Sequence, residues 1–130
     1  PAGNSLLAAR PSTSRYAPAA LGHHVWYDGS RGYPAAYRRL ECPERQMVDV
    51  ISLVDWLENV THTARLYTGI ERTYRQAVRD AVDQEGRRFS PLLTVRLQDG
   101  PAAARIEQAF EEGRRRAHRQ IYEAAPAEKR

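Results

Sequence analysis

The sequence predicts an all-α domain on three observations. Apolar residues recur at three- and four-residue steps, which places them on one face of a helix. No stretch of any length alternates apolar and polar residues, as a half-buried strand would. Proline and glycine divide the chain into segments of helical length, and no internal repeat is visible.

The first third of the chain predicts two short helices and a loop. Residues Asn4–Ala9 form the first helix, and Pro11 ends it. The triplet Ser12–Ser14 offers an N-cap for a second helix over Tyr16–His24. The stretch Tyr27–Leu40 contains two glycines and a proline, which indicates an irregular loop.

The longest clear helix comes next. Pro43 suits its first position, because proline lacks the N–H that a first helical residue leaves unpaired. Five apolar residues are spaced to form one stripe, which we expect to face the core: Met47, Val50, Ile51, Val54 and Leu57.

Three further helices are predicted in the second half. One spans about Ile70 to Gln84 and stops near Gly86, and another starts at Ser90-Pro91 and ends at Asp99-Gly100-Pro101. The last runs from about Ala102 to Glu123, with one apolar side formed by Ile106, Phe110, Ala117 and Ile121. We therefore expect a single helical domain over residues 1–125 and a disordered tail over residues 126–130.

Composition excludes several classes of protein. The chain has 130 residues and a formal net charge of +4, with 42% hydrophobic and 28% charged residues, which is ordinary globular composition. A single cysteine, Cys42, rules out an internal disulfide and a cysteine-rich zinc cluster. No apolar run approaches a membrane span, and the first residues do not resemble a signal peptide, so we expect a cytoplasmic protein.

Because the chain begins at Pro1 and its only methionine is Met47, we expect a processed product or a piece of something longer.

Asp55 is the carboxylate most open to a chemical interpretation. Met47, Ile51, Asp55 and Glu58 share one face of the predicted helix, and that face is apolar. A carboxylate there must be paired or bound to a metal, because burying an isolated charge is costly. An arginine or a helix N-terminus is the alternative partner. A site formed by the Asp55 carboxylate and the adjacent imidazoles of His23 and His24 would suit iron, manganese or zinc.

Together with a nearby loop, these residues resemble a known family. The run His23–Pro34 (HHVWYDGSRGYP) resembles the His-His…Asp-Gly-x-Gly-Tyr-Pro signature of the HD-GYP phosphodiesterases, a branch of the HD metal-dependent phosphohydrolases. Residues Val48–Thr61 resemble the family's helix that carries an aspartate ligand, and Gly86–Pro91 its late Gly-x-x-Phe-Asp-Pro. Residues Pro1–Leu7 resemble the segment just after the family's His-Pro.

The resemblance implies a role for each matching residue. His23, His24 and Asp55 match metal ligands. Gly32, Tyr33 and Pro34 match the loop that shapes the site beside the metals and supports protein contacts. Arg65 falls where the family has an arginine that reaches the substrate phosphate. The implied fold is a helical bundle of the HD type.

The sequence also departs from the family. Arg31 is an extra residue in the glycine loop, and Thr68 stands where a lysine is common. No His-Asp dipeptide is present, and the remaining histidines, His62 and His118, lie downstream of the pair. The chain therefore carries only the downstream half of the family's metal site, without the upstream helices that bear the His-Asp motif. Two histidines and one aspartate can hold one metal ion weakly.

Two functions follow from the resemblance. In the first, the chain is an incomplete catalytic domain of a phosphodiesterase that hydrolyses cyclic di-GMP or another phosphoester in the intact parent protein. The parent would supply the missing N-terminal half or a sensor or receiver domain. In the second, the chain is a degenerate signalling or interaction module, in which an exposed apolar face favours a homodimer.

A basic stretch near the end of the last helix offers a third function, nucleic-acid binding, which we rank last. It comprises Arg114–Arg116, His118 and Arg119, and we expect a solvated face on which Glu111 and Glu112 pair with arginines. No aromatic residues are interleaved with it, as a single-strand binder would need.

Overall fold

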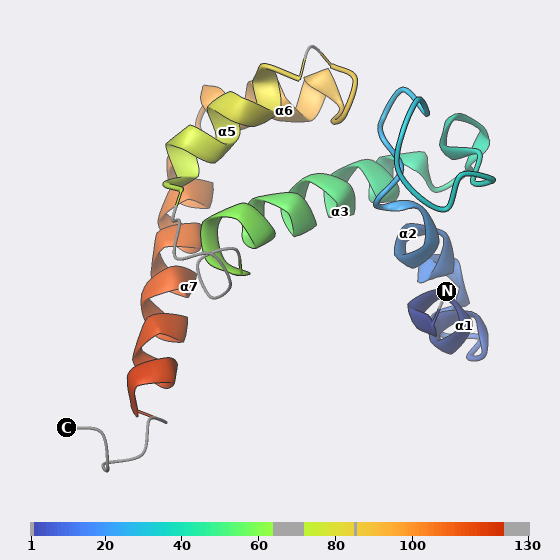
Figure 1. Cartoon of the computed structure of the whole chain (residues 1–130), viewed down its shortest axis with the longest axis horizontal. Helices are drawn as coiled ribbons and strands as arrows, with labels where there is room; N and C mark the ends of the chain where they lie inside the picture. The colour runs from blue at the N-terminus through green and yellow to red at the C-terminus, as the bar shows by residue number, and fades with distance from the viewer. Residues whose placement is uncertain (1, 64–71, 85, 124–130) are drawn as a thin grey trace.

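The computed structural model describes residues 2–63, 72–84 and 86–123, and every regular element within them is helical. The predicted all-α class is therefore confirmed. Figure 1 shows the elements, which in chain order are α1 (Ala2–Ala8), η1 (Ser14–Tyr16), α2 (Ala17–Gly22), η2 (Arg39–Glu41), α3 (Arg45–Glu58), the π-helical η3 (Asn59–Thr63), α5 (Tyr74–Val82), α6 (Pro91–Gln98) and α7 (Ala103–Glu123).

Helix α3 connects two groups of helices (Figure 1). At its start, α2 packs against it, and α1 packs against α2. At its other end it contacts α5, which packs with α6 and α7. The C-terminal half of α7 extends away from the other helices. Along the described residues, no helix combines the length and apolarity that a bilayer crossing needs.

Local signals account for most helix ends. Thr73 caps α5: its hydroxyl accepts from the Gln76 backbone N–H at 3.2 Å, while the Gln76 side chain accepts from the Thr73 N–H at 2.9 Å. This capping box starts the helix at Tyr74, and the predicted start at Ile70 lies outside the described residues, which resume at residue 72. Pro91 occupies the first turn of α6, as predicted.

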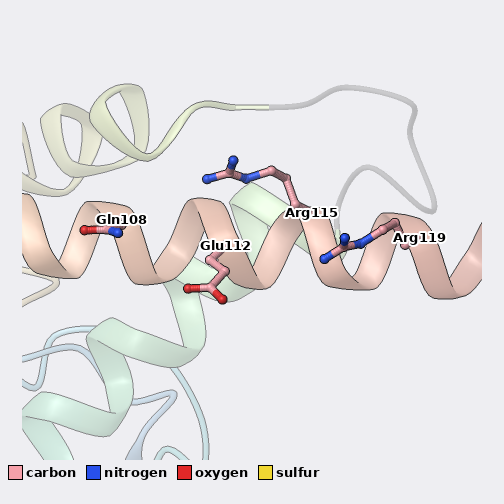
Figure 2. A pocket seen from close by; sticks show the side chains of 4 residues that line it. All are labelled: Gln108, Glu112, Arg115 and Arg119. Atoms are coloured by element: carbon pink, nitrogen blue, oxygen red, sulfur yellow. The ribbon is translucent and has the colours of Figure 1, made fainter.

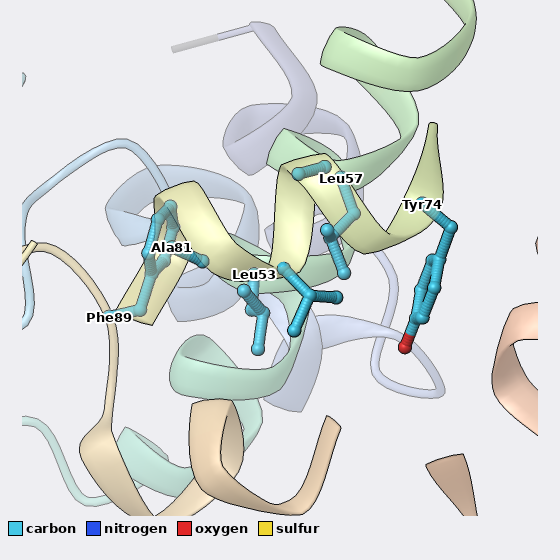
Figure 3. Close-up of a cluster of buried hydrophobic side chains, with 7 residues drawn as sticks. Leu53, Leu57, Tyr74, Ala81 and Phe89 are labelled. Atoms are coloured by element: carbon cyan, nitrogen blue, oxygen red, sulfur yellow. The ribbon is translucent and has the colours of Figure 1, made fainter. Parts of the chain in front are cut away.

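The hydrophobic core lies where α3, α5 and Phe89 meet (Figure 3). Its buried members are Leu53, Leu57, Tyr74, Ala77, Val78, Ala81 and Phe89. The rings of Trp56 and Phe89 are 5.0 Å apart, and those of Tyr74 and Phe110 are 5.3 Å apart, which attaches α3 to the segment before α6 and α5 to α7. Ile106 and Phe110 of the predicted apolar side of α7 pack on this core.

The predicted core stripe of α3 is wrong. Val50, Ile51 and Val54 are 47%, 37% and 48% exposed, and Leu57 alone of the five is fully buried. The buried face is instead formed by Val48, Asp49, Ser52, Leu53 and Leu57. Apolar residues occur on both faces of this helix, so their spacing allows either face to be buried. This face, which includes two polar residues, turns inward because Asp49 and Ser52 accept hydrogen bonds from the buried guanidinium of Arg39.

Candidate metal centre

The structure brings His23, His24 and Asp55 together. The two histidines follow the last turn of α2, and Asp55 lies in the last turn of α3. One ligand atom from each residue lies within 4.8 Å of the others, and His23 Nε2 is 3.9 Å from Asp55 Oδ2. Three residues of types that bind transition metals therefore converge from the end of α2 and from α3.

Asp55 is not on a buried apolar face, which corrects the expectation from helix spacing. Its side chain is 47% exposed, because the face of α3 that carries Ile51 and Asp55 points to solvent. Glu58, the other carboxylate on this predicted face, is also exposed and is not part of the cluster. Because the Asp55 carboxylate is solvated, it does not need a counter-charge or a metal ion to offset the cost of burial. The argument that it binds a metal rests instead on its position beside His23 and His24.

A backbone hydrogen bond orients the ring of His23. Its Nδ1 lies 3.0 Å from the carbonyl oxygen of Ala19, one helical turn earlier. Because a carbonyl oxygen only accepts, Nδ1 carries a proton in this contact, and in the neutral form of the ring the lone pair is then on Nε2. Nε2 is the atom that faces Asp55. A ligating histidine usually has this arrangement, with its second ring nitrogen donating to a carbonyl or a carboxylate.

His24 is held between two rings. Its centroid is 3.9 Å from that of His23 and 4.6 Å from that of Tyr33, on which it stacks. Partial burial lowers the pKa of His24 below its ordinary value, and the nearby His23 and Arg88 lower it further, whereas Asp55 opposes the shift. His24 is therefore neutral at pH 7, the state in which an imidazole binds a metal ion.

The glycine loop supports the histidine pair from outside. Gly32 has a φ of +98°, and a Cβ there would lie 2.0 Å from the carbonyl oxygen of His24. Only glycine permits this contact, so the loop can fold back onto the pair. The Trp26 N–H donates to the carbonyl of Arg31 at 2.9 Å, which closes the loop, and Pro34 follows Tyr33 at its far side. The structure therefore places Gly32 and Tyr33 against His24.

Arg39 fixes the backbone behind the histidines. It is 1% exposed, and its guanidinium donates to the carbonyl oxygen of Val25 and to Asp49, with a 2.8 Å contact to Asp49 Oδ1. Val25 directly follows His24, and Asp49 lies on the same helix as Asp55. The arginine therefore ties both halves of the ligand cluster into one unit. Sequence reasoning missed it, because the loop around it has no periodic pattern.

A small cavity of about 70 Å³ opens beside the ligands. Trp26, Trp56 and Arg88 contribute to its wall together with the cluster. Arg88 is a second residue that sequence reasoning missed, although it lies inside the Gly86–Pro91 segment that carries part of the resemblance. Arg65, His62 and the Thr68 position cannot be placed here, because the side chain of His62 and residues 64–71 lie outside the described part of the chain.

The ligand cluster fits a small divalent cation. Donor atoms bound to one ion at about 2.0–2.2 Å lie roughly 3–3.6 Å apart at octahedral or tetrahedral angles. Because the donor atoms here lie within 4.8 Å of one another, they have to close by up to roughly 2 Å to bind one ion. The exposed side chain of Asp55 is free to make that movement. Two imidazoles and one carboxylate suit iron, manganese or zinc and leave further coordination positions open.

A larger hollow of about 530 Å³ lies along α7, and Figure 2 shows the four side chains that line it: Gln108, Glu112, Arg115 and Arg119. All four come from one helix. The predicted pairing of this basic stretch is confirmed, since Arg114 Nη2 is 2.8 Å from Glu111 and Arg116 pairs with Glu112. These pairs describe a solvated helix face, so this hollow is not the candidate site.

No protein-family model, no curated protein and no solved structure matches this chain. A function therefore has to be argued from the residues of the site and from the motifs that they form.

Proposed function

We propose that His23, His24 and Asp55 are ligands of a divalent metal ion in an incomplete phosphohydrolase domain of the HD-GYP type. The convergence of the three donor atoms within 4.8 Å carries the proposal. Two supporting features are the neutral state of His24 and the hydrogen bond that leaves Nε2 of His23 free to bind. Iron, manganese and zinc are the metals that this donor set favours.

The chain's own residues would hold and orient the reacting groups. His23 and His24 bind through ring nitrogens, and Asp55 binds through a carboxylate oxygen. A bound divalent metal supplies a water of lowered pKa and neutralises charge on a phosphoryl group. Gly32, Tyr33 and Pro34 shape the edge of the site.

By resemblance, Arg65 contacts the substrate phosphate, and the substrate of the intact parent is a cyclic dinucleotide such as cyclic di-GMP. Three ligands are fewer than the centre of that family uses. The parent would therefore supply the remaining ligands from an upstream half, and the isolated chain would be inactive. A sensor or receiver domain would control the parent in the cytoplasm.

A second candidate function is a signalling or interaction module. The observation in its favour is the exposed apolar face of α3, formed by Val50, Ile51 and Val54. Tyr33, 61% exposed in the glycine loop, adds a further apolar contact point. In this alternative the chain forms a homodimer through α3 and the metal ligands no longer serve catalysis.

Metal content of the purified full chain tests the first function. The wild type is brought to equilibrium by dialysis against Mn²⁺, Fe²⁺ or Zn²⁺ and analysed for bound metal per chain, a method that also detects weak binding. The same is done for Asp55→Ala, for the His23→Ala/His24→Ala double variant, and for Asp83→Ala as a matched control. Asp83 is an exposed aspartate at the end of α5, away from the cluster.

We expect a stoichiometric metal in the wild type and in Asp83→Ala, and its loss in both cluster variants. A wild-type chain that retains no metal would refute the metal centre. Sedimentation velocity over a range of concentrations then tests the second function, in which Val54→Asp should convert a dimer into a monomer.

A further inference from the structure

Within the part of the chain that the structure describes, Arg88 is a cation without an anionic partner, and it lies beside His23, His24 and Asp55. It lines the 70 Å³ cavity together with His23, His24 and Asp55. Its neighbour Arg87 pairs with Asp28, at 3.3 Å between Nε and Oδ2. Within the described residues, Arg88 forms no ion pair, and its guanidinium donates no hydrogen bond. Its donors are therefore available to a ligand.

Aromatic rings hold the guanidinium of Arg88. Its Cζ lies 5.9 Å from the ring centroid of Trp26, 5.4 Å from that of Trp56 and 5.3 Å from that of Phe89. These distances are in the range of cation–π contacts, which use the face of the guanidinium. The N–H donors lie in the guanidinium plane and point outward from its edge. Aromatic packing thus restrains the side chain without consuming its hydrogen bonds.

The backbone of Arg88 is also fixed relative to the histidines. Its carbonyl oxygen accepts from the Tyr27 N–H at 2.9 Å, and the carbonyl of Arg87 accepts from the Asp28 N–H at 3.0 Å. Tyr27 and Asp28 begin the loop that folds back onto His24. The main chain and the side chain therefore both hold Arg88 at a set position beside the ligand cluster.

Among the described residues, the wall of the cavity carries the guanidinium of Arg88 and the carboxylate of Asp55, which do not form an ion pair with each other. Burial lowers the pKa of Arg88, because a cation removed from water without a counter-charge is disfavoured. Arg88 in turn contributes to the lowered pKa of His24, so its charge reaches the ligand cluster. An anion in the cavity would be attracted by Arg88 and by a bound metal ion together.

The size of the cavity limits what can enter it. The cavity beside the three residues measures about 70 Å³. Pockets that enclose a drug-sized molecule measure roughly 300–1,000 Å³. A phosphoryl group is of a size to enter, whereas a whole nucleotide has to leave its organic part outside.

We propose that Arg88 is an anion-binding residue that holds the phosphoryl oxygens of a phosphate ester next to His24 and Asp55. Two adjacent N–H groups of a guanidinium match two phosphoryl oxygens. The proposal rests on the proposed function for its substrate class, a phosphate ester. Phosphate binding can be measured both on the metal-free chain, in which the Asp55 carboxylate opposes the anion, and on the metal-loaded chain.

The test is inorganic phosphate binding to the full chain, measured by calorimetry with and without chelator. Four proteins are compared: the wild type, Arg88→Gln, Arg87→Gln and Arg96→Gln. Arg87 is the paired neighbour, and Arg96 is an exposed arginine of α6 that does not line the cavity. Each variant removes one positive charge, so a loss confined to Arg88→Gln separates a defined contact from net charge.

We expect Arg88→Gln to weaken phosphate binding by roughly ten- to a hundredfold, the loss typical of a hydrogen bond to a charged group. The dissociation constants of Arg87→Gln and Arg96→Gln for phosphate should stay within about twofold of the wild-type value. Arg88→Lys should recover only part of the affinity, because lysine keeps the charge and loses the paired donors. Equal losses in all three glutamine variants, or none in Arg88→Gln, would overturn the proposal.

A measurement on the wild type covers the case in which the Arg88 variants fail to fold. The Nε–H resonance of Arg88 should shift as phosphate is added, and should not shift with the same concentration of chloride. An unmoved resonance at saturating phosphate, or no phosphate binding by the wild type, contradicts the proposal.

The two proposals fail separately. If the wild type binds phosphate through Arg88 but retains no metal, the metal centre is wrong and the anion site stands. If the wild type and Arg88→Gln both bind a stoichiometric metal and the same amount of phosphate, the anion site is wrong and the metal centre stands.

Discussion

Arg39 and Asp49 form a buried ion pair in which Nη2 and Oδ1 lie 2.8 Å apart. The same guanidinium donates to the carbonyl of Val25 and to the hydroxyl of Ser52. A buried charge is tolerated only when it is paired and its donors are satisfied, and this arginine meets both conditions. The ion pair therefore fixes the position of Val25, the residue after His24, relative to α3.

Removing one partner of the Arg39–Asp49 pair should strongly lower the free energy of unfolding. Asp49→Ala leaves the guanidinium of Arg39 buried without its counter-charge, and we expect a loss of about 3–5 kcal/mol in the free energy of unfolding. Asp80→Ala is the control, since Asp80 pairs with Arg72 at the surface, and an exposed pair contributes about 0–1 kcal/mol. Urea unfolding followed by circular dichroism measures both. Equal losses for the two variants would show that the buried Arg39–Asp49 pair contributes no more to stability than an exposed ion pair does.

Two glycines in one loop should differ in their tolerance of a side chain. Gly32→Ala places a Cβ 2.0 Å from the carbonyl oxygen of His24, whereas a Cβ at Gly29 meets nothing within 4 Å. Both residues have a positive φ, so both variants carry a strain of roughly 1–2 kcal/mol. We expect Gly32→Ala to lose clearly more stability than Gly29→Ala and to displace the His24 ring signals in NMR spectra. Matching melting temperatures for the two variants would contradict the close contact.

His24 should titrate below an ordinary histidine in the metal-free chain. Since its pKa is lower in the folded state than in the unfolded one, protonation favours unfolding. Its contribution to stability is present above about pH 6.5 and is lost as the pH falls toward the folded pKa. Arg88→Gln should raise this pKa because a cation is removed, and Asp55→Asn should lower it further because an anion is removed. Proton NMR of the imidazole signals measures all three proteins, and a shift of the wrong sign in either variant contradicts this electrostatic account.

The two faces of α3 should respond differently to truncation. Leu57 is 1% exposed in the core, so Leu57→Ala should cost about 2–5 kcal/mol. Val54 is 48% exposed on the opposite face, and Val54→Ala should change the stability of the monomer by less than about 0.5 kcal/mol. Denaturant unfolding at low protein concentration measures both. A large loss for Val54→Ala that grows with protein concentration would instead support a dimer through this face.

The sequence was informative where a local rule decides the structure. Pro91 marks the start of α6, and the glycine–proline run Asp99–Pro101 separates it from α7 as predicted. The motifs along the chain also predicted that His23, His24 and Asp55 would meet, and the structure brings these three residues together. These features depend on neighbours in sequence or on a recognisable motif.

The sequence was misleading where a long-range contact decides the structure. The apolar spacing of α3 is compatible with two faces, and the buried guanidinium of Arg39, which the preceding element η2 contributes, selects the face with Asp49 and Ser52. The role suggested for Arg88 could not be foreseen either, since its surroundings combine Trp26, Trp56 and Phe89 from three segments. No local pattern encodes such an arrangement.

The aromatic contacts of Arg88 give the protein a built-in optical reporter. The chain contains two tryptophans, Trp26 and Trp56, and both lie against this guanidinium at the wall of the small cavity. Light emitted by indole therefore comes from this one neighbourhood and from nowhere else in the molecule. Emission intensity and wavelength should follow events at the cluster directly, with no dye attached and no residue replaced.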